Sequence, residues 1–114
     1  MLGGAAEQLY RRLRPEVEAM PWGTLDLSQW PEETVQRARR VWTMAAFQEY
    51  RTGAACAVAL EHLFAIRAPL DLIAVATRFP LDEVVHVELC ARLLDELGGA
   101  ADLRHDPTSL APKP

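Results

Sequence analysis

A long stretch without internal proline, from residue 31 to residue 64, repeats apolar or small residues at the spacing of one helix face. Such a stripe predicts an amphipathic helix. Pro31 suits the first helical position, and Glu32 and Glu33 suit the first turn, where the helix dipole favours negative charge. The stripe consists of Val35, Ala38, Trp42, Ala46, Gly53, Cys56, Leu60 and Leu63.

A second apolar stripe follows the sequence AIRAP, in which Pro69 permits a new helix to begin. The pair Gly98 and Gly99 forms a strong stop signal at its end. Within the stripe, Pro80 removes one backbone hydrogen bond. We therefore expect a bent helix, kinked or restarted just before Glu83, rather than two separated helices. The stripe consists of Ile73, Ala76, Phe79, Cys90, Leu93 or Leu94, and Leu97.

The two stripes predict an all-α protein built on an antiparallel helical hairpin. We divide the chain into an N-terminal segment, 1–30, a helix pair, 31–99, and a C-terminal tail or linker, 100–114. The first segment contains AAEQLYRRLR, which predicts a short amphipathic helix that Pro15 ends, and then several turn-forming residues. The tail is rich in proline and polar residues, so we expect an extended arm.

The composition argues against several classes of partner. The chain has 114 residues, half of them hydrophobic and a quarter charged, which is typical of one small globular domain. Its net charge of −4 gives no electrostatic attraction to nucleic acid or to an anionic membrane. The first residues lack the pattern of a signal peptide, and no apolar run reaches the ~20 residues that span a bilayer. We therefore expect a cytoplasmic protein that binds neither nucleic acid nor membrane.

Three ionisable residues interrupt the apolar stripes. Glu83 and His86 lie three residues apart on the face of the second stripe, and Glu49 lies on the face of the first. Glu49 precedes the turn by about 15 residues, and the other two follow it by about 14 to 17, so at ~1.5 Å per residue all lie ~20–25 Å from the turn. In an antiparallel hairpin the three side chains therefore meet in one layer between the helices.

This cluster has two interpretations at the level of residue types. Buried carboxylates are costly unless they are paired or bound to a cation. Carboxylates and an imidazole suit iron, manganese or zinc, and four-helix carboxylate proteins build dinuclear sites from Glu and Glu-x-x-His ligands. The alternative is a solvated helix face or a buried ion pair between Glu49 and His86, and spacing alone favours neither interpretation.

The segment VWTMAAFQEYRTG, followed about thirty residues later by DEVVHVELCARLLDELGG, resembles the first half of a ferritin-like di-iron carboxylate domain. The resemblance covers residues 31–99. It matches Glu49 to the ligand of the first helix, and Glu83 and His86 to the Glu-x-x-His of the second. It implies a dinuclear site for iron, with manganese as the alternative, and oxidoreductase chemistry with oxygen or peroxide. It does not choose among the iron stores, peroxidases and oxidases of that superfamily.

A complete domain of this family has two such helix pairs, and this chain has one. The other half of the four-helix bundle would come from a second copy, in a homodimer, or from a longer protein of which this chain is the front part. A lone hairpin would expose its apolar stripe, which indicates a partner surface. The alternative function is a metal-free helical interaction or dimerisation module that uses the stripe for association only.

Two neighbours of the predicted ligands are candidates for supporting roles. Asp82 precedes Glu83, and an acidic neighbour can orient a ligand histidine by a hydrogen bond, although an ordinary solvent-exposed residue is an equal alternative. Tyr50 follows Glu49 and is a candidate for hydrogen bonding or redox chemistry near the metal, although helix packing is the simpler interpretation. The two cysteines have neither the number nor the spacing of a disulfide framework or a zinc site.

Overall fold

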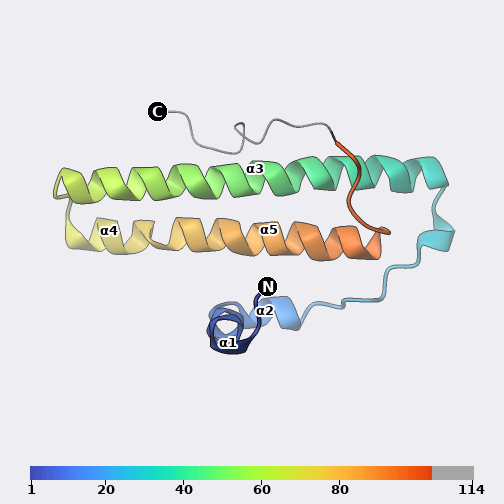
Figure 1. The fold of residues 1–114 in the computed structure, drawn as a ribbon, viewed down its shortest axis with the longest axis horizontal. Coiled ribbons are helices and arrows are strands. Elements are labelled where there is room, and N and C mark those ends of the chain that lie inside the picture. The colour runs from blue at the N-terminus through green and yellow to red at the C-terminus, as the bar shows by residue number, and fades with distance from the viewer. Residues whose placement is uncertain (104–114) are drawn as a thin grey trace.

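The structure, a computed structural model, describes residues 1–103 and is built mainly from helices (Figure 1). Its centre is an antiparallel hairpin, in which one long helix runs beside two shorter ones. The expected all-α class is confirmed, and no strand occurs among the described residues. The elements are α1 (Gly4–Leu13), α2 (Pro15–Glu18), the 3₁₀ turn η1 (Leu27–Gln29), α3 (Glu32–Ala65), α4 (Leu70–Ala76) and α5 (Arg78–Glu96).

The long helix α3 follows the first apolar stripe and begins directly after Pro31, as the sequence predicts. At its other end Arg67 adopts a left-handed conformation with φ 55°. The amide of Arg67 donates to the carbonyl of Phe64 at 3.0 Å, and the amide of Ala68 donates to that of Leu63 at 3.0 Å. This pair of bonds is a Schellman motif, which satisfies the last carbonyls of α3 and turns the chain toward α4.

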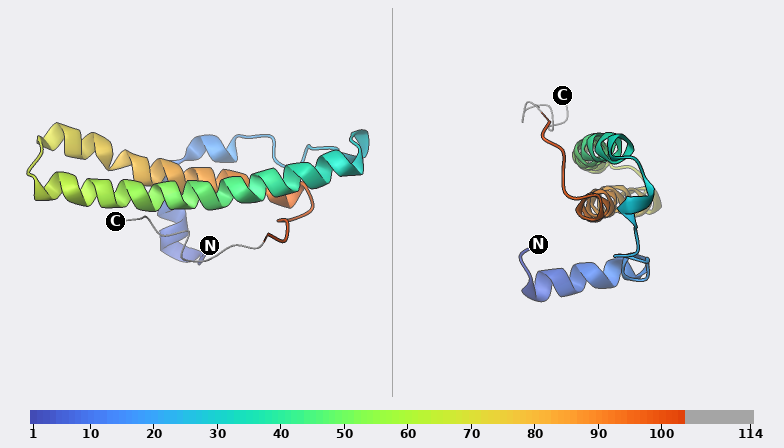
Figure 2. Two further views of the ribbon diagram at one scale, coloured as in Figure 1. Left: turned by 90° about the horizontal axis from the view of Figure 1, so that it is seen from above. Right: turned by 90° about the vertical axis from the view of Figure 1, so that its right-hand side faces the viewer.

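The break between α4 and α5 lies at Thr77, before Pro80. Pro80 has no N–H to donate to the carbonyl of Ala76, so the helical hydrogen-bond ladder is interrupted there. Thr77 keeps helical angles, φ −63° and ψ −22°, and α5 continues from α4 with a change of direction (Figure 2). The chain bends as predicted, but the break lies at Thr77 rather than just before Glu83, and it divides the stretch into two helices. Pro80 falls in the first turn of α5, where a missing N–H costs little.

The helix α5 ends at the two predicted glycines. Gly98 and Gly99 adopt φ angles of 101° and 108°, which residues with a side chain rarely adopt. The amide of Gly99 donates to the carbonyl of Leu94 at 2.7 Å, again as in a Schellman motif. The guanidinium of Arg39 donates to the carbonyl of Gly99 at 2.8 Å, which ties the end of the hairpin to α3. Most of the predicted tail, 104–114, lies outside the described residues.

A separate N-terminal layer lies against α5, on the side remote from α3 (Figure 2). Its first helix, α1, is the predicted short helix and ends before Pro15. Arg14, which joins α1 to α2, has a fully buried side chain whose Nη2 donates to Oε2 of Glu88 at 2.9 Å. Glu88 on α5 is itself only 9% exposed. A charge this deeply buried needs a charged partner, so the pair fixes the N-terminal layer to α5.

The hairpin has a thin core. Among the described residues of α3, only Thr43 is buried, and large apolar side chains such as Trp42 and Phe64 remain exposed. Most of the buried apolar surface therefore belongs to the other arm of the hairpin. Its buried apolar residues are Ile73, Ala76, Cys90, Leu94 and Leu97. Within residues 1–103, no helix combines the length and the apolar character needed to cross a membrane.

Candidate metal centre

Glu49, Glu83 and His86 lie together between α3 and α5. Nδ1 of His86 is 3.3 Å from Oε2 of Glu49 and 3.3 Å from Oε2 of Glu83. One ligand atom from each of the three residues falls within 4.8 Å of the others. The hairpin therefore brings into one cluster the three residues that the sequence predicts as metal ligands.

A glycine allows this close approach of the two helices. Gly53 lies one turn after Glu49 on α3 and faces α5, where a Cβ built on it would be 3.1 Å from Cβ of Glu83. Such a contact is tighter than nine in ten real Cβ contacts, so a side chain here would push Glu83 and α5 away by a few tenths of an ångström. The three-residue spacing of Glu83 and His86 then places both side chains on the face near Glu49.

The cluster is partly open to solvent. The side chain of Glu83 is 18% exposed, that of Glu49 is 35% exposed, and that of His86 is 49% exposed. The sequence pattern places all three on an apolar face, yet in a single hairpin this face is only partly covered. The ligand atoms are therefore within reach of an ion from solvent.

The two carboxylates lie close to each other and to the imidazole of His86. A hydrogen bond with Glu49, together with burial, raises the pKa of Glu83. Burial acts to lower the pKa of His86, but hydrogen bonds to Glu83 and Glu49 outweigh it, so the pKa of His86 is raised. Both raised pKa values mean that the cluster stabilises the protonated form of its groups and so favours added positive charge. A metal cation would supply that charge as well.

Cys90 lies one turn beyond His86 on α5 and is buried. Burial and the negative charge of Glu49 both raise the pKa of its thiol, so the sulfur stays protonated and is a poor metal ligand. Cys90 and Cys56 are both free thiols. The donor set of the cluster is therefore two carboxylates and one imidazole.

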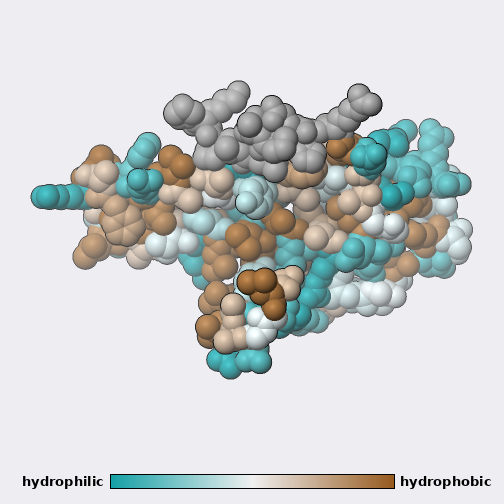
Figure 3. All heavy atoms as spheres, viewed as in Figure 1, coloured by the Kyte–Doolittle hydropathy of each residue, from teal (hydrophilic) through white to brown (hydrophobic). Residues whose placement is uncertain are grey.

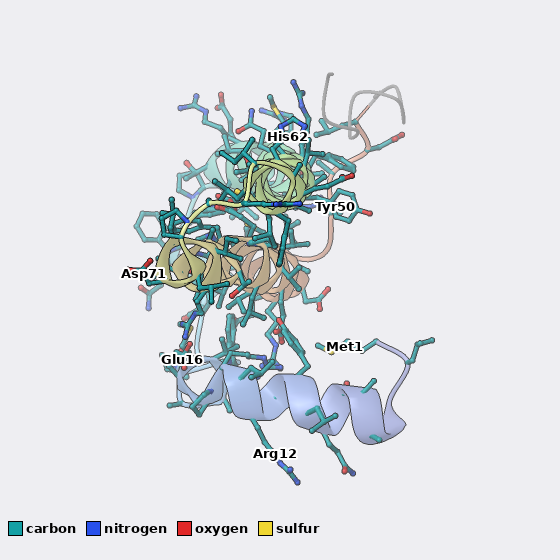
Figure 4. All side chains as sticks on the ribbon, turned by 90° about the vertical axis from the view of Figure 1, so that its left-hand side faces the viewer. Met1, Arg12, Glu16, Tyr50, His62 and Asp71 are labelled. Atoms are coloured by element: carbon teal, nitrogen blue, oxygen red, sulfur yellow. The ribbon has the colours of Figure 1, made fainter. Side chains whose placement is uncertain are left out.

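Asp82 and Tyr50 lie beside the cluster. Oδ1 of Asp82 is 3.8 Å from Nη2 of Arg78, in an exposed pair along α5. Tyr50 is exposed and projects outward from α3, as does His62 at another point of the helix (Figure 4). The supporting roles of Asp82 and Tyr50 at a metal stay predictions.

Sequence reasoning misses the anchor of α5 to the N-terminal layer. Glu88 follows His86 by two residues and therefore faces away from α3. It accepts a hydrogen bond from the hydroxyl of Tyr10 at 2.6 Å, besides its pairing with Arg14. The partners are more than seventy residues apart in the chain, so no local pattern joins them. The one available signal is an acidic residue on the side of α5 opposite the predicted ligands.

Comparisons of the chain with protein-family models, with curated proteins and with solved structures find no match. The resemblance of residues 31–99 to a ferritin-like helix pair therefore stays a prediction. The chemistry of the cluster has to be argued from its own donor atoms and their surroundings.

Proposed function

We propose that the chain is a metal-binding protein of the ferritin-like type, which holds iron through Glu49, Glu83 and His86. The observation that carries this proposal is the convergence of three ligand atoms within 4.8 Å from two different helices. Two carboxylates and one imidazole are the donors that iron, manganese and zinc prefer, and no thiolate is present to favour a softer metal. The choice of iron, with manganese as the alternative, rests on the resemblance of the two helices to a di-iron half-domain.

A second copy of the chain would complete the site. One hairpin offers three ligands, whereas dinuclear carboxylate sites take ligands from four helices. Phe79 lies two turns before His86, and Trp42 lies two turns before Glu49, so each shares a helix face with a ligand. Phe79 is 53% exposed and Trp42 is 40% exposed. A partner hairpin packed on this face would bury both and would make a four-helix bundle in a homodimer.

A bound iron centre would supply redox chemistry with dioxygen or peroxide at the coordination positions that the protein leaves open. The protein's own part is to hold the donors. Glu83, the most buried of the three, would be a fixed carboxylate ligand between the helices. Glu49 would supply the second carboxylate, and His86 would bind through its imidazole after it loses a proton. This makes oxidoreductase activity the proposed reaction class.

Metal binding by variants tests this proposal. We expect Glu49→Ala and His86→Ala each to weaken ferrous iron binding, measured by anaerobic equilibrium dialysis, by more than about tenfold. His62→Ala is the matched control, because His62 lies on α3 away from the cluster and is exposed (Figure 4). Retention of iron by His86→Ala at the level of His62→Ala would contradict the proposal.

A metal-free interaction module is the second candidate, and the exposed apolar residues Phe79 and Trp42 favour it. Under that alternative, Glu49→Ala and His86→Ala leave self-association unchanged or strengthen it, because they remove polar groups from the interface. Sedimentation of the metal-free variants separates the two. Strong association without any measurable iron binding in the unchanged protein would favour the module.

A further inference from the structure

A cavity lies between the last turns of α5 and the connection that leads from α2 to α3. Its volume of about 560 Å³ falls in the range of small-molecule sites. It is separate from the proposed metal cluster, none of whose three residues lines it. We call it the Trp30 cavity; its lining includes Met20, Trp22, Leu25, Asp26, Trp30 and Glu96.

The cavity also lies away from the exposed apolar surface beside α1. In both views of Figure 2, α1 extends to one side of the hairpin, whereas the connection from α2 to η1 runs along the other. Figure 3 looks onto the side of α1, where hydrophobic side chains gather between the helices. The kind of ligand therefore has to be inferred from the lining of the Trp30 cavity itself.

Two indoles line the cavity, and one of them is fixed by contacts with its surroundings. Nε1 of Trp22 donates to the carbonyl of Val17 at 2.7 Å, and Val17 is fully buried. The guanidinium of Arg92 lies 5.3 Å from the centre of the Trp22 ring, yet Arg92 does not line the cavity. The second indole, that of Trp30, is 56% exposed. Tryptophan attracts cations to its ring face more strongly than tyrosine or phenylalanine does, so this lining suits a positively charged ligand.

Two carboxylates line the same cavity, and none of the described lining residues is basic. Oδ1 of Asp26 accepts from the hydroxyl of Ser28 at 2.6 Å and from its amide at 3.0 Å, and these bonds lower the pKa of Asp26. Oε1 of Glu96 accepts from the amide of Gly23 at 2.5 Å. Neither carboxylate forms an ion pair within residues 1–103. Their negative charge is therefore not neutralised by the protein, and the lining is complementary to a cation.

We propose that the Trp30 cavity binds a small organic cation of the quaternary ammonium class. The indoles would contact the methyl groups of such a cation, and the carboxylates would stabilise its charge. A metal ion suits the lining less well, because an indole offers only an N–H donor and no ligand atom. A primary ammonium ion also suits it less well, since Asp26 and Glu96 already accept hydrogen bonds from the protein. The proposal goes beyond metal binding and does not depend on it.

Calorimetric titration of the full chain, with metal removed by a chelator and dialysis, tests the cavity with three probes. We expect choline to bind. Its uncharged isostere 3,3-dimethylbutan-1-ol, in which a carbon atom replaces the nitrogen, should bind more weakly by about tenfold or more. The primary ammonium ion of 2-aminoethanol should bind more weakly than choline by about threefold or more, because its charge is more strongly hydrated.

Variants of Trp30 test the aromatic part of the site. Trp30→Leu should weaken choline binding by about tenfold, whereas Trp30→Phe should weaken it less, since phenylalanine keeps an aromatic face. Phe64→Leu is the matched control, because Phe64 is 59% exposed and does not line the cavity. The graded effect of leucine and phenylalanine at one position separates lost binding from lost folding.

Variants of the carboxylates test the part played by charge. Asp26→Asn and Glu96→Gln keep an oxygen that accepts the local hydrogen bond but remove the charge, so each should weaken choline binding by about threefold or more. Glu61→Gln, at an exposed position of α3, is the control. The proposal is overturned if choline does not bind, if the uncharged isostere binds equally well, or if Trp30→Leu binds choline as well as Phe64→Leu does. Because every measurement uses metal-free protein, failure here leaves the metal proposal unaffected.

Discussion

Gly53 of α3 lies directly against Glu83 of α5, so that a Cβ on Gly53 would stand 3.1 Å from Cβ of Glu83. The atom in the way is the first side-chain atom of Glu83, which cannot move unless α5 moves. The same glycine therefore sets both the distance between the helices and the position of the central carboxylate of the cluster. Packing and ligand geometry are coupled at this one contact.

Replacement of Gly53 by leucine tests the coupling. Leucine favours a helix over glycine by about 0.8 kcal/mol, but forcing its side chain against Glu83 costs about 1–3 kcal/mol. We expect the free energy of unfolding, measured with urea, to fall slightly and iron affinity to fall by more than about tenfold. Ala55→Leu, at an exposed position of α3, is the control and should change neither. Unchanged iron binding in Gly53→Leu would show that the cluster does not need this spacing.

Removal of Glu88 should destabilise the protein strongly. Glu88→Ala leaves the buried guanidinium of Arg14 with Glu18 as its remaining carboxylate partner, and removing one partner of a buried ion pair costs up to about 3–5 kcal/mol. Glu18→Ala removes a carboxylate that also pairs with Arg14 but is much more exposed, and should destabilise the protein far less. Urea unfolding of the two variants measures both losses of stability. Equal losses would mean that the buried pair does not anchor the N-terminal layer.

The phenol of Tyr10 should titrate at unusually high pH. Burial, the hydrogen bond to Glu88 and the negative charge of Glu88 raise its pKa from 10.0 to about 12. Folding therefore favours the neutral phenol, and this stabilisation is complete below pH 10 and is lost as the pH rises toward about 12. The chain has two tyrosines, so in Tyr50→Phe the tyrosinate absorbance follows the titration of Tyr10 alone. Glu88→Gln should lower the midpoint, and a midpoint near 10 in the folded protein would contradict the contact.

The turn between α3 and α4 should accept glycine. Arg67 holds φ 55°, a conformation that costs a residue with a side chain about 1–2 kcal/mol. Arg67→Gly removes that cost but adds backbone freedom to the unfolded chain, so we expect a net gain of about 0.5–1 kcal/mol in thermal or urea unfolding. Arg51→Gly, in the interior of α3, should instead lose about 1 kcal/mol. A loss of stability in Arg67→Gly would point to a contact of the arginine side chain.

The sequence predicts best what local chemistry decides. Pro31 and the glycines after α5 mark helix ends because their backbone preferences act on the nearest residues, and these bounds are confirmed. The break at Thr77 is predicted only approximately, since a missing amide at Pro80 can be absorbed at several nearby positions. The approach of Glu49 to Glu83 follows from the helical rise, once both helices are assumed continuous and antiparallel.

Contacts between distant segments are beyond such reasoning. The pairing of Arg14 with Glu88 joins residues 74 positions apart, on a side of α5 that the apolar stripe does not mark. The solvent exposure of the His86 side chain cannot be predicted in this way either, because it depends on whether another layer covers that face of the hairpin. The exposure of α1 has the same origin: α1 is held across α5 by polar contacts, and none of its residues is buried.

One measurement tests the central claim most directly: elemental analysis and sedimentation equilibrium on the same sample of protein loaded anaerobically with ferrous iron. The account predicts a dimer that contains about two iron ions, and much less iron in His86→Ala prepared in parallel. A monomer without iron would contradict it, and so would equal iron in the unchanged protein and in His86→Ala.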